Sequence, residues 1–158
     1  MQRRSLWRSF ADAFAGFSET WRAERNMRIH TFMATLAVGA GRLGALSRGE
    51  WLLLFLTIAF VFAVELINTA IEAAVDLTTD AVRPLARTAK NAAAAAVLIT
   101  AAGAVAAAWW LFVPRLPTYP AAFVGWWRLD PLGAAVWTAA ALAAGCGALW
   151  VGSEKRRR

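Results

Sequence analysis

Residues 51–76, WLLLFLTIAFVFAVELINTAIEAAVD, join an apolar run to a group of strongly polar side chains in its second half. A transmembrane helix needs about 20 predominantly apolar residues, so the stretch predicts a membrane span at about 51–75. Its strongly polar side chains are Glu65, Asn68, Glu72 and Asp76. At about 100° per residue, these four and Thr69 share one stripe roughly 100° wide. Because ionisable side chains are costly at membrane depth, the stripe predicts a functional site.

The composition predicts an all-α integral membrane protein. The chain has 158 residues, of which 59% are hydrophobic, and several runs are long enough to cross a bilayer. The net charge of +7 comes from basic clusters beside apolar runs. That distribution is typical of orientation in a membrane, and it argues against nucleic acid as a partner. The single cysteine, Cys146, excludes a disulfide framework and a cysteine-based metal cluster within the chain.

An amphipathic helix is predicted before the first span, at about residues 5–26. Aromatic and aliphatic residues recur there at spacings of three and four, with arginines between them, which is typical of a helix lying on the bilayer surface. Packing against a soluble partner is the alternative. The first span is predicted at about 29–46, where the glycines match a dinucleotide-binding pattern by spelling only: Gly39, Gly41 and Gly44. No strand precedes them, so close helix packing is the better interpretation.

The rest of the chain alternates between polar connections and apolar runs. A polar loop is predicted at 78–88, a third span at about 89–113, and an extracytoplasmic loop with an aromatic anchor at 114–131. A fourth span at about 132–151 and a basic tail at 152–158 complete the chain.

The positions of the basic residues predict the orientation. Thirteen of the 17 lie before residue 29, between the second and third spans, or in the tail. Four spans bring these three segments to the same side, which the excess of Lys and Arg marks as cytoplasmic. Both termini and the polar end of the second span are therefore expected at the cytoplasmic face of a bacterial inner membrane.

The groups expected at that face favour phosphoryl transfer. The sequence has no Walker loop, nucleophile elbow or zinc-binding spacing. Carboxylates bind Mg²⁺ together with substrate phosphates, and Lys or Arg can hold phosphate oxygens. A partly desolvated carboxylate can accept a proton from an alcohol. Transfer from a soluble nucleotide to a lipid alcohol would use all of these groups.

Four segments carry a resemblance to the prokaryotic diacylglycerol kinase family, which includes the undecaprenol kinases: ERNMRIH at 24–30, SRGEWLLL at 47–54, ELINTAIEAAVD at 65–76 and LARTAKNAAAAAVLI at 85–99. The similarity covers roughly residues 5–113, within a membrane domain at 1–113. It implies a homotrimeric enzyme that uses ATP and Mg²⁺ to phosphorylate undecaprenol or diacylglycerol at the cytoplasmic face. In the family, the site lies between subunits.

The resemblance also implies a role for each matching residue. Glu65 resembles the general base, Asn68 and Asp76 resemble active-site polar partners, and Glu24 and Glu72 resemble the metal-binding carboxylates near the nucleotide. Lys90 resembles a nucleotide phosphate contact, with Asn91 and Arg83 beside it. The lipid substrate is expected to contact Glu65, Asn26, Arg28 and Trp51, although Asn26 and Arg28 could instead anchor the helix among the headgroups.

Two departures from the family pattern keep other functions open. Asn91 stands where the family usually has Asp, and Ala81 and Val82 replace acidic and aromatic residues. A membrane assembly or regulatory subunit derived from the kinase is therefore one alternative, and an ion or proton pathway along the carboxylate stripe is another. The segment from Pro114 onward is additional to the family pattern. Because every site residue precedes it, removing it is expected to leave catalysis in place.

Overall fold

The computed structural model describes residues 5–78 and 83–149, and within these ranges all the secondary structure is helical. The predicted basic tail at 152–158, Ala81 and Val82 lie outside the described residues. The elements are α1 (Leu6–Ala23), α2 (Arg25–Leu43), α3 (Arg48–Thr78), α4 (Pro84–Phe112), the short 3₁₀ helix η1 (Val113–Thr118), α5 (Tyr119–Leu129) and α6 (Pro131–Leu149).

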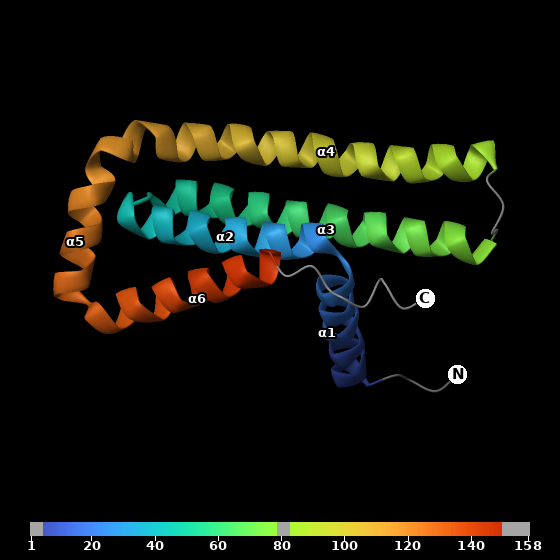
Figure 1. Cartoon of the computed structure of the whole chain (residues 1–158), viewed down its shortest axis with the longest axis horizontal. Coiled ribbons are helices and arrows are strands. Elements are labelled where there is room, and N and C mark those ends of the chain that lie inside the picture. The colour runs from blue at the N-terminus through green and yellow to red at the C-terminus, as the bar shows by residue number, and fades with distance from the viewer. Residues whose placement is uncertain (1–4, 79–82, 150–158) are drawn as a thin grey trace.

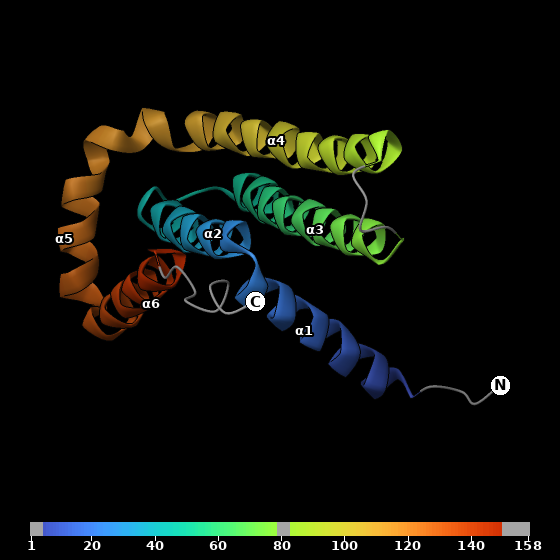
Figure 2. The same ribbon diagram turned by 45° about the vertical axis from the view of Figure 1, so that its right-hand side comes forward.

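Four helices lie side by side and two lie across them. Figures 1 and 2 show α2, α3, α4 and α6 running along the long axis of the molecule. The short α5 crosses one end of this group and joins α4 to α6, while α1 leaves the group where α2 begins, part of the way along α3. Large apolar side chains on the outer surfaces of α3, α4 and α6 are exposed, as lipid-facing positions require.

Three helical stretches in the described part of the chain are long and apolar enough to cross a membrane: Arg48–Thr78, Pro84–Leu129 and Pro131–Leu149. This confirms an all-α, multi-pass membrane protein. The second stretch includes α4, η1 and α5, and the chain turns at η1 (Figure 1). The predicted first span corresponds to α2, which is not among the three although it lies against α6 and α3. Its 19 residues include Arg25, Arg28 and Arg42.

Helix α3 is longer than the sequence pattern predicts because a capping box starts it early. The Ser47 N–H donates to Glu50 Oε2 at 2.8 Å, and the Glu50 N–H donates to Ser47 Oγ at 3.4 Å. This reciprocal pair satisfies two backbone donors at the start of the helix. Residues 48–50, predicted as part of a connection, are therefore helical.

The prediction of a loop over 114–131 is wrong in its secondary structure. Residues 113–118 form η1 and residues 119–129 form α5. Each of these helices has a proline in its first turn, where the missing N–H is not needed and the fixed φ suits a helix. Asp130 then separates α5 from α6, and its Oδ1 accepts from the Gly133 N–H at 2.9 Å.

A polar clamp and an apolar cluster join the helices at the α5 end. The Arg115 guanidinium donates to Glu50 Oε1 at 2.6 Å and to the Gly44 carbonyl at 3.1 Å, which links α3 to the end of α2. Leu46, Leu54 and Leu111 form the buried cluster beside it. This end of the bundle contains no member of the predicted carboxylate stripe.

Close packing joins α6 to α2, and Gly39 makes it possible. A Cβ built on Gly39 would lie 2.0 Å from the Trp137 ring, whose Nε1 donates to the Thr35 carbonyl at 3.1 Å. The interpretation of Gly39 as a packing glycine is thus confirmed.

Gly39→Ala is expected to destabilise the protein, because the added methyl group would push the Trp137 indole away from α2. Overpacking of this kind typically costs about 1–3 kcal/mol. The matched control is Gly103→Ala in α4, where a Cβ meets nothing within 4 Å. Since Ala favours helix over Gly, the control should be neutral or stabilising. Thermal unfolding in detergent, followed by circular dichroism, measures both; equal midpoints for the two variants would contradict the prediction.

Candidate active site

The polar stripe of α3 faces the junction between α1 and α2. Glu65 lies on this stripe and is only 1% exposed. The Asn26 side chain hydrogen-bonds its carboxylate, and Glu24 and Glu72 lie close enough for their negative charges to act on it. The structure therefore brings together residues 24–26 and the second half of α3 within one chain.

Two buried acceptor atoms in this region lack a partner among the described residues. They are Glu65 Oε2 and Asn68 Oδ1. The Asn68 amide nitrogen donates to Glu72 Oε1 at 3.0 Å, which orients both side chains along the helix. Buried polar atoms are nearly always hydrogen-bonded in native proteins, so two free acceptors on adjacent turns favour a binding site for a donor or a cation.

Asp76 and Lys90 form an ion pair that joins the last turns of α3 to the first turns of α4. Both side chains are partly exposed. Asn91 follows Lys90 on α4 and is exposed, and Arg83 is exposed at the N-cap position of the same helix. The residues predicted to contact the nucleotide thus lie at the start of α4: Arg83, Lys90 and Asn91. The exposed end of the α3 stripe, at Asp76, is next to them.

Glu24 separates α1 from α2 by an extended backbone conformation, with φ −98° and ψ 124°. Its N–H still donates to the Thr20 carbonyl at 2.8 Å, so it closes α1 before the chain turns. Arg28 is 5% exposed and donates to the Arg22 carbonyl at 2.9 Å and the Trp21 carbonyl at 3.4 Å. Basic side chains often bind the free carbonyls at a helix end. Arg28, predicted as a substrate contact, therefore holds the end of α1.

Trp51 does not belong to this group of residues. It lies 14 positions before Glu65 on the same helix, which is about 21 Å at 1.5 Å per residue. Its ring stacks on Phe55 with centroids 5.4 Å apart and packs against the Leu46, Leu54 and Leu111 cluster. The length of α3 thus carries Trp51 to the other end of the helix, and its contact with the lipid substrate stays a prediction.

The described residues do not by themselves form a complete metal site. No group of three or more His, Cys, Asp or Glu side chains that could hold a metal ion occurs among residues 5–78 and 83–149. Mg²⁺ usually takes one or two carboxylates from the protein and completes its coordination with phosphate oxygens and water. Glu24 and Glu72, whose charges both act on Glu65, match that kind of donor set.

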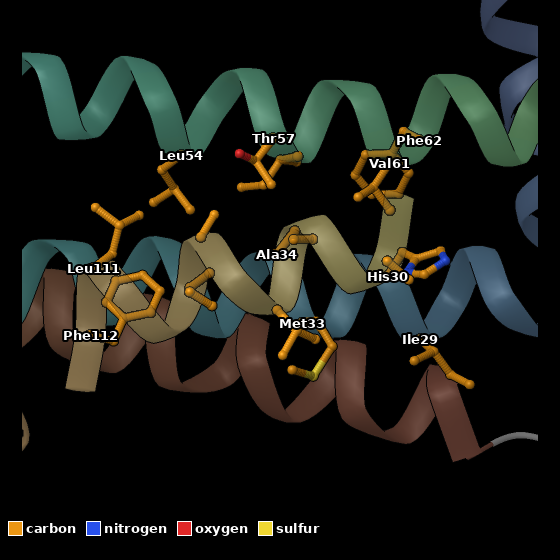
Figure 3. A pocket seen from close by; sticks show the side chains of 17 residues that line it. Ile29, His30, Met33, Ala34, Leu54, Thr57, Val61, Phe62, Leu111 and Phe112 are labelled. Carbon is orange, nitrogen blue, oxygen red and sulfur yellow. The ribbon is translucent and has the colours of Figure 1, made fainter. Parts of the chain in front are cut away.

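An apolar cavity of about 270 Å³ lies between α2, α3 and α4 (Figure 3). Leu54, Leu111 and Phe112 lie at one end of the view, and His30 and Phe62 lie at the other. Its α3 lining includes Leu54, Ile58, Val61 and Phe62 at helical spacing, and the next position on that face is Glu65. The polar stripe thus continues an apolar, cavity-lining stripe. This cavity was not predicted from the sequence, although the spacing of its α3 residues could have indicated the shared face.

These features define a multi-pass membrane protein with a carboxylate site at one end of an apolar cavity. The family model for prokaryotic diacylglycerol kinase matches residues 11–112. The undecaprenol kinase of Bacillus subtilis (strain 168) is 44% identical over 111 residues, which cover 70% of this chain and 90% of that protein. The diacylglycerol kinase of Synechocystis sp. is 38% identical over 99 residues, 58% of this chain and 57% of that protein. No solved structure gives a significant match.

The chain therefore belongs to the prokaryotic diacylglycerol kinase family, a family of membrane lipid kinases. The match ends where α4 ends, so η1, α5 and α6 follow the family region.

Proposed function

We propose that this protein transfers the γ-phosphate of ATP to the hydroxyl group of a membrane lipid alcohol. Undecaprenol is the favoured acceptor, because the undecaprenol kinase relative is 44% identical over 70% of the chain, and diacylglycerol is the second. The single observation that carries the proposal is the buried Glu65 carboxylate, with Oε2 free, one turn of α3 beyond an apolar cavity.

The chemistry requires a base for the lipid hydroxyl. With the hydroxyl end of its hydrocarbon in the cavity, the lipid would present its hydroxyl to Glu65 Oε2, which would take the proton as the lipid oxygen attacks the γ-phosphorus. The bond from that phosphorus to the bridging oxygen breaks, and ADP leaves. The hydrogen bond from the Asn26 side chain to the Glu65 carboxylate would keep the base oriented.

The remaining groups would bind the nucleotide. Glu24 and Glu72 would hold Mg²⁺, which supplies positive charge that offsets the phosphate oxygens. Asn68 orients Glu72 through its amide. Lys90, placed by Asp76 at the exposed end of the stripe, would bind phosphate oxygens, with Asn91 and Arg83 beside it.

We further propose a homotrimer in the cytoplasmic membrane, with the site and both termini facing the cytoplasm. The basic residues before residue 29 and between α3 and α4 support this orientation. The free acceptors at Glu65 and Asn68 support a site that a second subunit and the substrates complete.

The decisive experiment is a lipid kinase assay with the purified full-length chain. Undecaprenol or diacylglycerol in mixed micelles is incubated with radiolabelled ATP and Mg²⁺, and label in the lipid is measured. Label in undecaprenol above that in diacylglycerol is expected. No transfer to either lipid would overturn the proposal. Transfer by Asn91→Asp alone would favour the regulatory subunit derived from the kinase.

Lys90→Met is expected to raise the KM for ATP about 10- to 100-fold and to leave the KM for the lipid unchanged. A hydrogen bond to a charged group contributes about 1.5–3 kcal/mol, which corresponds to that range. Initial rates at varied ATP and varied lipid separate the two constants. Arg87→Met, one turn earlier on the same helix, is the matched control and should keep both. An unchanged KM for ATP in Lys90→Met would show that Lys90 serves only the ion pair with Asp76.

A further inference from the structure

The segment beyond the family match packs against the part of the chain that carries the site. Helix α6 runs along α2 from the α5 end toward the α1–α2 junction (Figures 1 and 2). It is seated by Trp137 at Gly39 and, two turns further on, by Gly145, where a Cβ would lie 3.2 Å from the Phe32 ring. The path of α6 thus leads to the end of the bundle that holds Glu65.

The last turns of α6 reach Trp21, in the final turn of α1. A Cβ built on Gly147 would lie 3.7 Å from the Trp21 ring. The other side of the same side chain is fixed by its Nε1, which donates to Thr31 Oγ1 at 3.0 Å. The Trp21 ring is thus hydrogen-bonded to α2 and lies beside Gly147 of α6.

Trp21 lies three residues before Glu24 and shares its surroundings. The Trp21 carbonyl accepts from the buried Arg28 guanidinium, which also binds the Arg22 carbonyl. Helix α1 has no buried residue of its own, and its contact with α3 includes the edge-to-face pair of Phe17 and Phe62. The position of the α1–α2 junction thus depends on a few contacts. One of them is the approach of Gly147 in α6 to the Trp21 ring.

We propose that α6 is a positioning element for the active site: by packing on Trp21 it holds Glu24 and Asn26 against Glu65. This inference rests on the proposed function. Trp21 touches none of the reacting groups and acts as a positioning residue. A displacement of about 1 Å among catalytic groups can reduce the rate about 10²-fold. A helix that holds the α1–α2 junction in place therefore has a measurable effect on activity.

Helix α6, which makes this contact with Trp21, lies outside the region that the family model matches. The Bacillus relative is matched over 90% of its own length, which leaves it too little chain for a helix like α6. Hence α6 is expected to adjust the position of Glu24, and with it the binding of MgATP. This inference differs from the expectation that removing the segment from Pro114 onward leaves catalysis in place.

The test replaces the glycine that faces Trp21. Gly147→Leu should displace the indole and raise both the KM for MgATP and the Mg²⁺ concentration for half-maximal rate about tenfold, with the KM for undecaprenol unchanged. Ala143→Leu, at an exposed position on the same helix, is the matched control and should match the wild type. Equal effects of the two variants, or a loss confined to the lipid KM, would overturn the inference.

Trp21 provides a second pair of variants. Trp21→Ala should reproduce the kinetic change of Gly147→Leu, and Trp21→Phe, which keeps an aromatic ring against α6, should restore most of the wild-type MgATP dependence. A Trp21→Ala enzyme with wild-type constants would contradict a positioning role.

A distance measurement tests whether α6 holds the α1–α2 junction, and it does not depend on kinase activity. Spin labels at Glu19 on α1 and Ala73 on α3, both exposed positions, report the angle between the helices. The distance distribution should broaden in Gly147→Leu and stay narrow in Ala143→Leu. If the wild type phosphorylates no lipid, the proposed function fails, but this measurement still decides whether α6 holds the junction. An unchanged distance distribution in Gly147→Leu would exclude a positioning role for α6.

Discussion

Glu65→Gln is expected to reduce lipid phosphorylation about 10²- to 10⁴-fold while MgATP binding stays near the wild-type level. The loss of a general base has this typical size. Gln has nearly the same shape and keeps an oxygen that can accept from the Asn26 amide, so the fold around position 65 should persist. What the amide cannot do is take a proton from the lipid hydroxyl.

Two measurements are needed for this variant. Initial rates with undecaprenol give turnover, and titration calorimetry with a non-hydrolysable ATP analogue and Mg²⁺ gives nucleotide affinity. Glu19→Gln, an exposed carboxylate on α1, is the control and should retain both. If Glu65→Gln loses nucleotide affinity as strongly as turnover, Glu65 is a metal ligand and the assignment of the base is wrong.

Glu72→Gln is expected to raise the Mg²⁺ concentration for half-maximal rate about 10- to 100-fold and to restore part of the rate at high Mg²⁺. A neutral amide oxygen is a weaker ligand for a hard cation than a carboxylate. The Asn68 amide can still donate to the side-chain oxygen that the substitution leaves in place, so the hydrogen bond observed at 3.0 Å need not be lost.

Calorimetric titration of the ATP analogue at several Mg²⁺ concentrations checks this variant apart from turnover. The analogue's affinity should depend more steeply on Mg²⁺ in Glu72→Gln than in the Glu19→Gln control. A variant with unchanged Mg²⁺ dependence and lost turnover would move Glu72 from metal binding to the chemical step.

Much of the candidate site could be predicted from the sequence because it lies within short stretches. Glu65, Asn68, Glu72 and Asp76 share a helix face by spacing alone, and the structure places them on one stripe of α3. The resemblance added Glu24, which the structure brings near Glu65. Trp51, by contrast, is separated from Glu65 by about 21 Å of helix.

The sequence by itself determined the class of protein and the polar side chains that share one face of α3. Apolar runs of membrane length force helices, because in a bilayer every backbone polar group must be bonded within its own segment, and the period of the helix then places the carboxylates. These are local consequences, each read within one segment of the chain.

Only the tertiary structure decided which segments meet. It showed that Arg28 closes α1, that an apolar cavity continues the carboxylate stripe, and that α6 reaches Trp21 beside the junction. Such contacts depend on the shapes of facing side chains, as where the Trp137 ring fits only because Gly39 has no Cβ. Close packing between helices distant in sequence leaves no periodic signal in either helix, so the position of α6 against α2 could not be predicted from the sequence.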